Sequence, residues 1–217
     1  MKKFVFRRDD ADLPGDLDLL EDAGALFAGG ERVAISERLV QDVTQPGVRL
    51  AELRAEGCVV ERAQLAESEI GALVLKDVRL VGCDLANAKA HRMALVRVEF
   101  VDCRLKGLIS KSIDWRDVLG ENSDWSYAQM CGAEMRNSEF RGCNWQEADL
   151  QDAELSGCVF QRCNLKRAEW LRTRLENADL RGSDVDGLQV GIGDLRGAIV
   201  DAAQAMEFAK LLGVQIR

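Results

Sequence analysis

An apolar residue recurs at every fifth position over most of this chain of 217 residues. Of the 31 positions divisible by five between 50 and 200, all are apolar except Ser110 and Gly120. Two residues before this central position the side chain is usually small, as at Cys83, Ala148 and Ala178. Such a spacing matches neither an α-helix nor a plain strand, whose side chains repeat every 3.6 and 2 residues.

The spacing of five suits a chain that runs extended for about three residues and then turns a corner. The small residue and the central residue are two apart, so both point inward, whereas the polar residue between them and the two corner residues point outward. Ten of the 19 glycines occupy the second corner position, where glycine relieves backbone strain. Repeated corners predict a solenoid whose coils pair at about 4.8 Å and share one core.

The tryptophans of the repeats are interpreted as core residues because they occupy central positions. Trp125 and Trp145 are twenty residues apart and are predicted to stack in successive coils. Ser110 and Gly120 leave the core underfilled at their positions. We therefore expect residues 107–121 to form the least regular coil, either within the rod or as a projecting loop.

The repeat, as in Ala148-Asp149-Leu150 and Ala178-Asp179-Leu180, resembles the pentapeptide-repeat family over at least residues 48–202. This resemblance implies an all-β fold: a right-handed quadrilateral β-helix with four pentapeptides per coil, followed by a short C-terminal α-helix. Residues twenty apart would then stack. The expected organisation is an N-terminal cap over residues 1–32, a β-helix over 33–200, and a C-terminal helix and strand over 201–217.

Both ends of the chain depart from the repeat. At the N-terminus, residues 3–6 could form a strand and residues 16–28 a short helix that ends at two glycines. At the other end, Asp201 followed by Gln204 is typical of a capping box at a helix N-terminus. Residues 214–216 are interpreted as a short strand.

The C-terminal segment Leu212-Gly213-Val214 resembles the tail of the Qnr- and MfpA-type quinolone-resistance proteins. In that group the tail joins two copies end to end, so the resemblance implies a homodimer. The alternative is a monomeric cap with the same apolar stripe. The interface residues expected from the resemblance are Met206, Phe208, Leu211, Leu212, Val214 and Ile216.

The sequence offers little material for catalysis. It has one histidine, and it contains no nucleophile–base pair, phosphate-binding loop or metal motif. We therefore expect a protein that is not an enzyme and has no catalytic residue, cofactor or metal. Four inward cysteines would form a straight ladder without the tetrahedral geometry of a zinc site, and they are interpreted as small apolar fillers: Cys83, Cys103, Cys143 and Cys163.

Charge and cysteine usage indicate the surroundings of the protein. There are 37 acidic and 29 basic residues, a net charge of -8, which disfavours nucleic acid as a partner because its phosphates require a basic surface. No run of 18 apolar residues is present to span a membrane. Seven cysteines without a recognisable secretory signal predict free thiols in the cytoplasm.

The four sides of the rod differ in their outward residues. The side with central residues Val60, Leu80 and Phe100, termed the acidic side, carries the largest excess of acidic over basic residues. Aliphatic residues lie among these acids, a combination that can mark a protein-binding surface. The candidate partner-binding residues are Val81, Glu99, Val101, Asp102, Glu121, Glu139 and Asp179.

Two functional hypotheses follow. The resemblance to quinolone-resistance proteins implies a non-enzymatic protein-interaction module that mimics DNA, binds DNA gyrase and protects it from quinolones or other gyrase poisons. The alternative is a pentapeptide-repeat scaffold that binds another protein and is unrelated to gyrase. The acids do not form a continuous stripe with the charge density of DNA, which weakens the first hypothesis.

Overall fold

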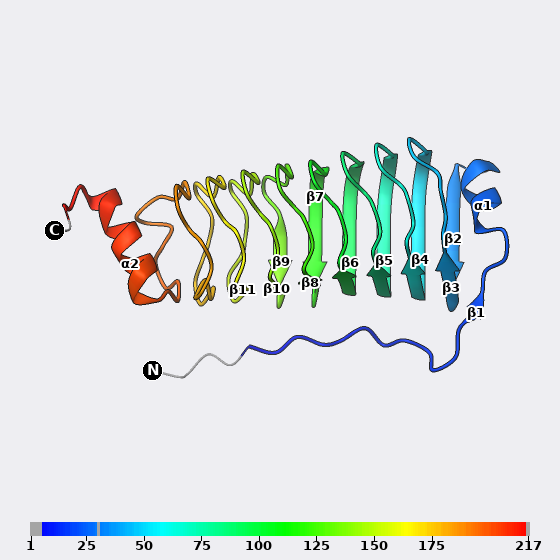
Figure 1. The fold of residues 1–217 in the computed structure, drawn as a ribbon, viewed down its shortest axis with the longest axis horizontal. Coiled ribbons are helices and arrows are strands. Elements are labelled where there is room, and N and C mark those ends of the chain that lie inside the picture. The colour runs from blue at the N-terminus through cyan, green and yellow to red at the C-terminus, as the bar shows by residue number, and fades with distance from the viewer. Residues whose placement is uncertain (1–5, 30, 216–217) are drawn as a thin grey trace.

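The five-residue repeat winds the chain into a right-handed quadrilateral β-helix, seen as a rod of stacked coils in Figure 1. This computed structural model describes residues 6–29 and 31–215. Strand pairs are parallel and join residues twenty apart, as for Leu50 with Ile70 and Ile70 with Ala90. Because each side takes five residues, a shift of twenty closes a four-sided coil.

The strands are longest near the N-terminal end of the rod. There β4 (Arg49–Glu61), β5 (Glu69–Val81) and β6 (Lys89–Val101) each turn a corner within one strand. Beyond them the chain is held by shorter strands and by single bridges in the same twenty-residue register. The shorter strands of the rod are β2 (Arg32–Ser36), β3 (Arg38–Gln41), β7 (Ile109–Arg116), β8 (Leu119–Glu121), β9 (Glu134–Arg136), β10 (Glu139–Arg141) and β11 (Val159–Gln161).

The corners of the coils use left-handed backbone conformations. At most corners the second residue after the central position has a positive φ whether or not it is glycine, as at Asp77 (54°), Arg97 (51°) and Gly107 (68°). The first corner inside each of the strands β4 to β7 does not have this conformation. At Gly107 a Cβ atom would also come within 2.5 Å of Asn87 Oδ1. Glycine is therefore favoured there both by the backbone conformation and by the close approach of the coil below.

The interior is filled by the central and small positions of the repeat. Trp125 and Trp145 stack as predicted, with ring centroids 5.1 Å apart and planes inclined by 5°. The prediction of an underfilled core at Gly120 is wrong, because a Cβ atom there would lie 2.7 Å from Cδ1 of Phe140, whose ring fills the space. Residues 107–121 stay within the regular register and form no projecting loop.

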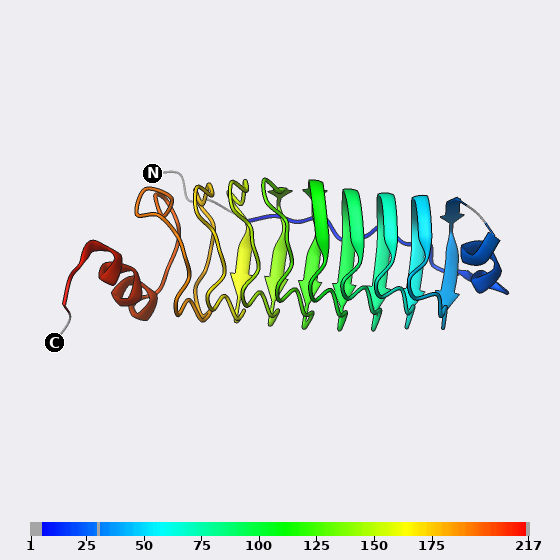
Figure 2. The same cartoon turned by 90° about the horizontal axis from the view of Figure 1, so that it is seen from above.

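The N-terminal end of the rod is covered by α1 (Ala23–Gly29), whose Ala23 and Phe27 are buried against the core. The predicted helix is shorter than expected, because residues 18–19 instead form β1 (Asp18–Leu19), which pairs with β3. The strand predicted for residues 3–6 lies outside the described residues except for Phe6, which belongs to no strand. Residues 6–17 run along the outside of the rod, parallel to its long axis (Figures 1 and 2).

The C-terminal end carries α2 (Ala202–Ala209), followed by the 3-10 turn η1 (Lys210–Leu212). The capping box between Asp201 and Gln204 is present as predicted. Gln204 is buried, and its Nε2 donates hydrogen bonds to the carbonyl oxygens of Leu180 (2.5 Å) and Ser183 (2.7 Å). It thereby attaches the helix to the last regular coil.

The short strand predicted at the C-terminus is not formed as far as the chain is described. Val214 and Gln215 belong to no strand, and Ile216 lies outside the described residues. None of the helices in residues 6–29 and 31–215 has the length and apolar character needed to cross a membrane.

Candidate protein-interaction surface

The seven candidate partner-binding residues lie on one side of the rod. Glu99, Glu139 and Asp179 belong to one column of residues, stacked through Leu119 and Val159 in successive coils. Val81, Val101 and Glu121 form the neighbouring column, and Asp102 lies at the adjoining corner.

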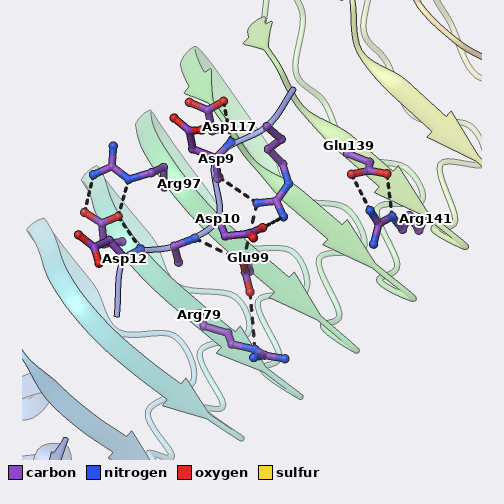
Figure 3. A network of polar contacts seen from close by, with 12 residues as sticks. Asp9, Asp10, Asp12, Arg79, Arg97, Glu99, Asp117, Glu139 and Arg141 are labelled. Atoms are coloured by element: carbon purple, nitrogen blue, oxygen red, sulfur yellow. Dashed lines mark hydrogen bonds and ion pairs between the residues drawn. The ribbon is translucent and has the colours of Figure 1, made fainter. Parts of the chain in front are cut away.

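Arginines neutralise part of this surface. Glu139 is buried and receives two hydrogen bonds from Arg141, at 2.7 and 2.9 Å, and Asp179 is paired with Arg181 at 2.6 Å. Figure 3 shows the pair of Glu139 and Arg141 beside the polar network described below. The acidic side is therefore a mixed surface rather than an uninterrupted negative stripe.

Two of the predicted acidic residues have no ion-pair partner among the described residues and are termed open. Asp102 is exposed and Glu121 is half-buried, and neither forms an ion pair with a described side chain. The predicted aliphatic residues Val81 and Val101 are only half-buried. These four residues form the accessible part of the predicted surface.

An N-terminal segment lies across this surface, a contact that the sequence analysis does not predict. Residues 6–17, termed the N-terminal strap, lie along the acidic side and the corner beside it (Figures 2 and 3). Pro14 lies beside Gly57, where a Cβ atom would be 3.6 Å from Pro14 Cδ, and Asp9 reaches Asp117, three coils further along. At about 4.8 Å per coil the strap advances roughly 2.9 Å per residue, close to the spacing of an extended strand.

The strap is held by carboxylates of three successive coils. The backbone N–H of Asp12 donates to Asp77 Oδ1 at 3.0 Å. The N–H groups of Ala11 and Asp9 donate to Glu99 Oε1 and Asp117 Oδ1, each at 3.4 Å. These contacts join main-chain donors of the strap to carboxyl side chains of the rod.

Arg8 is the one charged side chain of the strap that is buried beneath it. Its side chain is 7% exposed, and Nη1 lies 3.7 Å from Glu99 Oε1. Arg8 also pairs with Asp10 in the strap itself, whereas its buried Nε has no hydrogen-bond partner among the described residues. Glu99 faces a second arginine from the rod, Arg79, at 3.7 Å.

The electrostatics at Asp77 couple the strap to the rod. The Arg97 guanidinium donates two hydrogen bonds to Asp77, at 2.6 and 2.7 Å, and these are the largest cause of the lowered pKa of that carboxyl. Burial opposes them and raises the pKa, while the N–H of Asp12 lowers it further. The ionised form of Asp77 is thus stabilised from the rod and from the strap.

A second exposed surface is formed by the C-terminal tail. Met206, Leu211, Leu212 and Val214 are exposed, with Leu212 at 64%. Phe208 differs from the other predicted dimer residues, because it is partly buried against the core of its own chain. Ile216 lies outside the described residues.

The cysteines of the predicted ladder are buried and free, whereas Cys131 is exposed. Ser123 continues the ladder, since its Oγ accepts a hydrogen bond from the N–H of Cys103 at 3.0 Å. Within residues 6–29 and 31–215, no group of three or more histidine, cysteine or acidic side chains is placed to hold a metal ion.

The docking of the strap on the rod cannot be predicted from the repeat. Its residues follow no repeat, and its docking depends on Asp77, Glu99 and Asp117, which the sequence does not distinguish from the other outward acids of the rod. The sequence offers one signal for this contact: Arg8 is a basic residue outside the repeat, and the acidic side of the rod carries an excess of acidic residues that could pair with it.

Comparisons with known proteins agree with this geometry. The family model described as pentapeptide repeats (8 copies) matches residues 146–182 and 158–189. A trypsin-treated variant of QnrB1, described as a plasmid-mediated fluoroquinolone resistance protein, is 19% identical, with a TM-score of 0.55 over 93% of this chain and 98% of that chain. At this identity the likeness shows a shared fold.

Two further solved structures are less similar. Full-length QnrB1 is 13% identical over 86% of this chain and 100% of that chain, with a TM-score of 0.31. HetL, from the cyanobacterium Nostoc sp. strain PCC 7120, is 19% identical over 80% of this chain and 92% of that chain, with a TM-score of 0.27. Both scores are too low to carry a structural comparison. No curated protein matches the sequence.

Proposed function

We propose that this chain, whose residues 146–189 match the pentapeptide-repeat family model, is a protein-interaction module whose acidic side binds a protein partner. The observation that carries the proposal is the combination of open acids and half-buried aliphatic residues on one side of a rigid rod, at Asp102, Glu121, Val81 and Val101. Apolar side chains provide buried contact area in such an interface, while the charges direct association. Its seven cysteines are free, which fits a protein of the cytoplasm.

The first candidate partner is DNA gyrase, with protection of the enzyme from quinolones or related poisons as the outcome. Support comes from the β-helix fold shared with a protein described as a fluoroquinolone resistance protein. In this proposal the acidic side takes the place of DNA on a basic surface of gyrase. Asp102 and Glu121 would supply much of the attraction, because neither is neutralised by a described arginine or lysine.

A scaffold for a different protein partner is the second candidate. It is favoured by the pairing of Glu99, Glu139 and Asp179 with arginines, which lowers the net charge of the surface. A DNA mimic would gain from a continuous row of unpaired acids, whereas a scaffold needs only a complementary partner.

We also propose that the protein is a homodimer joined at its C-terminal tails. Exposed apolar residues at the end of a rod would be covered by the same residues of a second copy, in a two-fold interface. Met206, Leu211, Leu212 and Val214 are available for this contact, while Phe208 contributes part of its surface to its own chain.

The experiment that tests the gyrase proposal measures binding and supercoiling together. Wild-type protein is titrated into gyrase at low salt, and supercoiling is assayed with and without ciprofloxacin. Reversing both open charges, Asp102→Lys with Glu121→Lys, should slow association and weaken binding about tenfold or more, because charge steering acts on the on-rate. The effect should shrink at high salt, where screening acts within about 3 Å at 1 M.

A matched control carries the same change of charge on other sides of the rod. Asp114 and Asp186 are exposed and form no ion pair with a described side chain, so Asp114→Lys with Asp186→Lys should leave binding nearly unchanged. Absence of wild-type binding at low salt would remove gyrase as the partner. Equal losses in both double variants would show that the acidic side is not the contact surface.

A further inference from the structure

We infer that the acidic side is a docking surface for an extended, arginine-bearing segment of a partner protein, and that the N-terminal strap fills it in the free chain. The inference rests on the proposed function in one respect, because it takes the acidic side as the partner-binding surface. The strap thereby acts as a tethered competitor for the partner segment.

The shape of the occupant follows from the way the strap is bound. Asp77, Glu99 and Asp117 lie in three successive coils and accept N–H groups of an extended main chain. Because every residue except proline offers a backbone N–H, these contacts recognise an extended conformation with little regard to sequence. Main-chain recognition of this kind is a common way to bind a peptide segment, with side-chain sites adding specificity.

Arg8 indicates which side chain a partner segment needs in order to replace the strap. Its guanidinium lies beneath the strap beside Glu99, in the most enclosed position that any charged residue of the strap occupies. A buried guanidinium is retained only where a carboxylate accompanies it, so this position selects arginine from an incoming segment. Arg7, the preceding residue, is exposed and makes no ion pair with a described side chain, and it provides a matched control.

The strap is a poor electrostatic match for the surface that it covers. Asp9 and Asp12 are exposed, and each is bonded through its own N–H to a carboxylate of the rod, Asp117 or Asp77. Like charges held this close repel each other, so the docking of the strap is weaker than its contacts alone would give. A partner segment with the arginine but without the two aspartates would bind better and could replace the strap.

The test uses a labelled peptide of residues 6–17 and a truncated protein that lacks residues 1–15. Fluorescence anisotropy should show saturable binding of the peptide to the truncated protein. Full-length protein should bind at least about tenfold more weakly, because a tethered strap competes at an effective concentration near the millimolar range. An Arg8→Ala peptide should bind at least about tenfold more weakly than an Arg7→Ala peptide, and a peptide with Asp9→Asn and Asp12→Asn should bind several-fold more tightly.

Three results would overturn the inference: no binding to the truncated protein, equal binding to full-length and truncated protein, or equal affinities of the Arg8→Ala and Arg7→Ala peptides. Should the truncated chain fail to fold, full-length protein with Asp12→Pro takes its place, since proline removes the N–H that binds Asp77. The assay contains no gyrase. Peptide binding without gyrase binding would therefore retain the docking surface and reject only the gyrase proposal.

Discussion

Phe140 is predicted to be among the most costly core positions to shorten. Its side chain is completely buried, with its ring centroid 4.9 Å from that of Trp145 and 5.0 Å from that of Phe160. Removing a buried phenylalanine costs about 3–5 kcal/mol, and each lost aromatic pair adds roughly 0.5–1.5 kcal/mol. Phe140→Ala should therefore lower the free energy of unfolding by about 5 kcal/mol.

The same ring explains Gly120, and this allows a double-mutant cycle. A Cβ atom at Gly120 would lie 2.7 Å from Phe140 Cδ1 and 3.2 Å from Cys143 Sγ, so Gly120→Ala alone should cost about 1–3 kcal/mol through overpacking. In the Phe140→Ala background the added methyl group enters vacated space. There the same substitution should change stability by less than about 0.5 kcal/mol, a favourable coupling of roughly 1–3 kcal/mol.

Urea denaturation of the wild type, both single variants and the double variant measures this coupling. Gln161→Ala is the control, because Gln161 is exposed beside buried Phe160 and should change stability by under about 0.5 kcal/mol. If Gly120→Ala costs the same in both backgrounds to within about 0.3 kcal/mol, the account of how the core is filled is wrong.

Two further predictions concern the tail and the strap. Met206→Glu with Leu212→Glu should convert a dimer into particles of 24.0 kDa by light scattering, whereas a wild-type protein that already has this mass would contradict the dimer proposal. Asp77 has a pKa below its ordinary 3.8, first because of Arg97 and also through the N–H of Asp12, so its contribution to stability is complete above pH 3.8 and is lost as the pH falls through the lowered value. The difference in unfolding free energy between wild type and Asp77→Asn should thus be present at pH 7 and shrink as the pH falls below 3.8; a difference that stays constant down to pH 2 would contradict this.

The repeat predicts the β-helix because each pentapeptide imposes the same local geometry. One register places Trp125 over Trp145 and puts most second corner residues at positive φ, so the stacking and these corners can be predicted from the repeat alone. The repeat does not predict how the core is filled at Gly120, because this depends on the direction in which the ring of Phe140 points from the next coil.

The last coil shows a further limit of the periodic pattern. Leu195 keeps its place in the register of five, but residues 192–197 form turns and Leu195 is only partly buried. The carboxylate of Asp194 accepts the N–H groups of Gly191 and Arg172, at 2.9 and 2.8 Å, which holds the chain in this shape. A local hydrogen bond thus replaces the regular strand bridge.

The position of the candidate site could be predicted from the sequence, but its ion pairs and its covering by the strap could not. The repeat places its seven residues on one side, because outward positions twenty apart must stack. Pairing of Glu139 with Arg141 depends on side-chain directions within a strand, and the cover over Glu99 depends on a segment about ninety residues away in the chain. Such contacts between a non-repeating segment and the rod leave no periodic signal.

The central claim, in its most specific form, is that DNA gyrase binds the acidic side and displaces the strap. Residue-resolved hydrogen exchange of the full-length protein, with and without a saturating amount of gyrase, tests it most directly. The account predicts faster exchange at the N–H groups of Asp9, Ala11 and Asp12, which lose their carboxylate partners, and slower exchange around Asp102 and Glu121. Unchanged exchange at all five positions would contradict it.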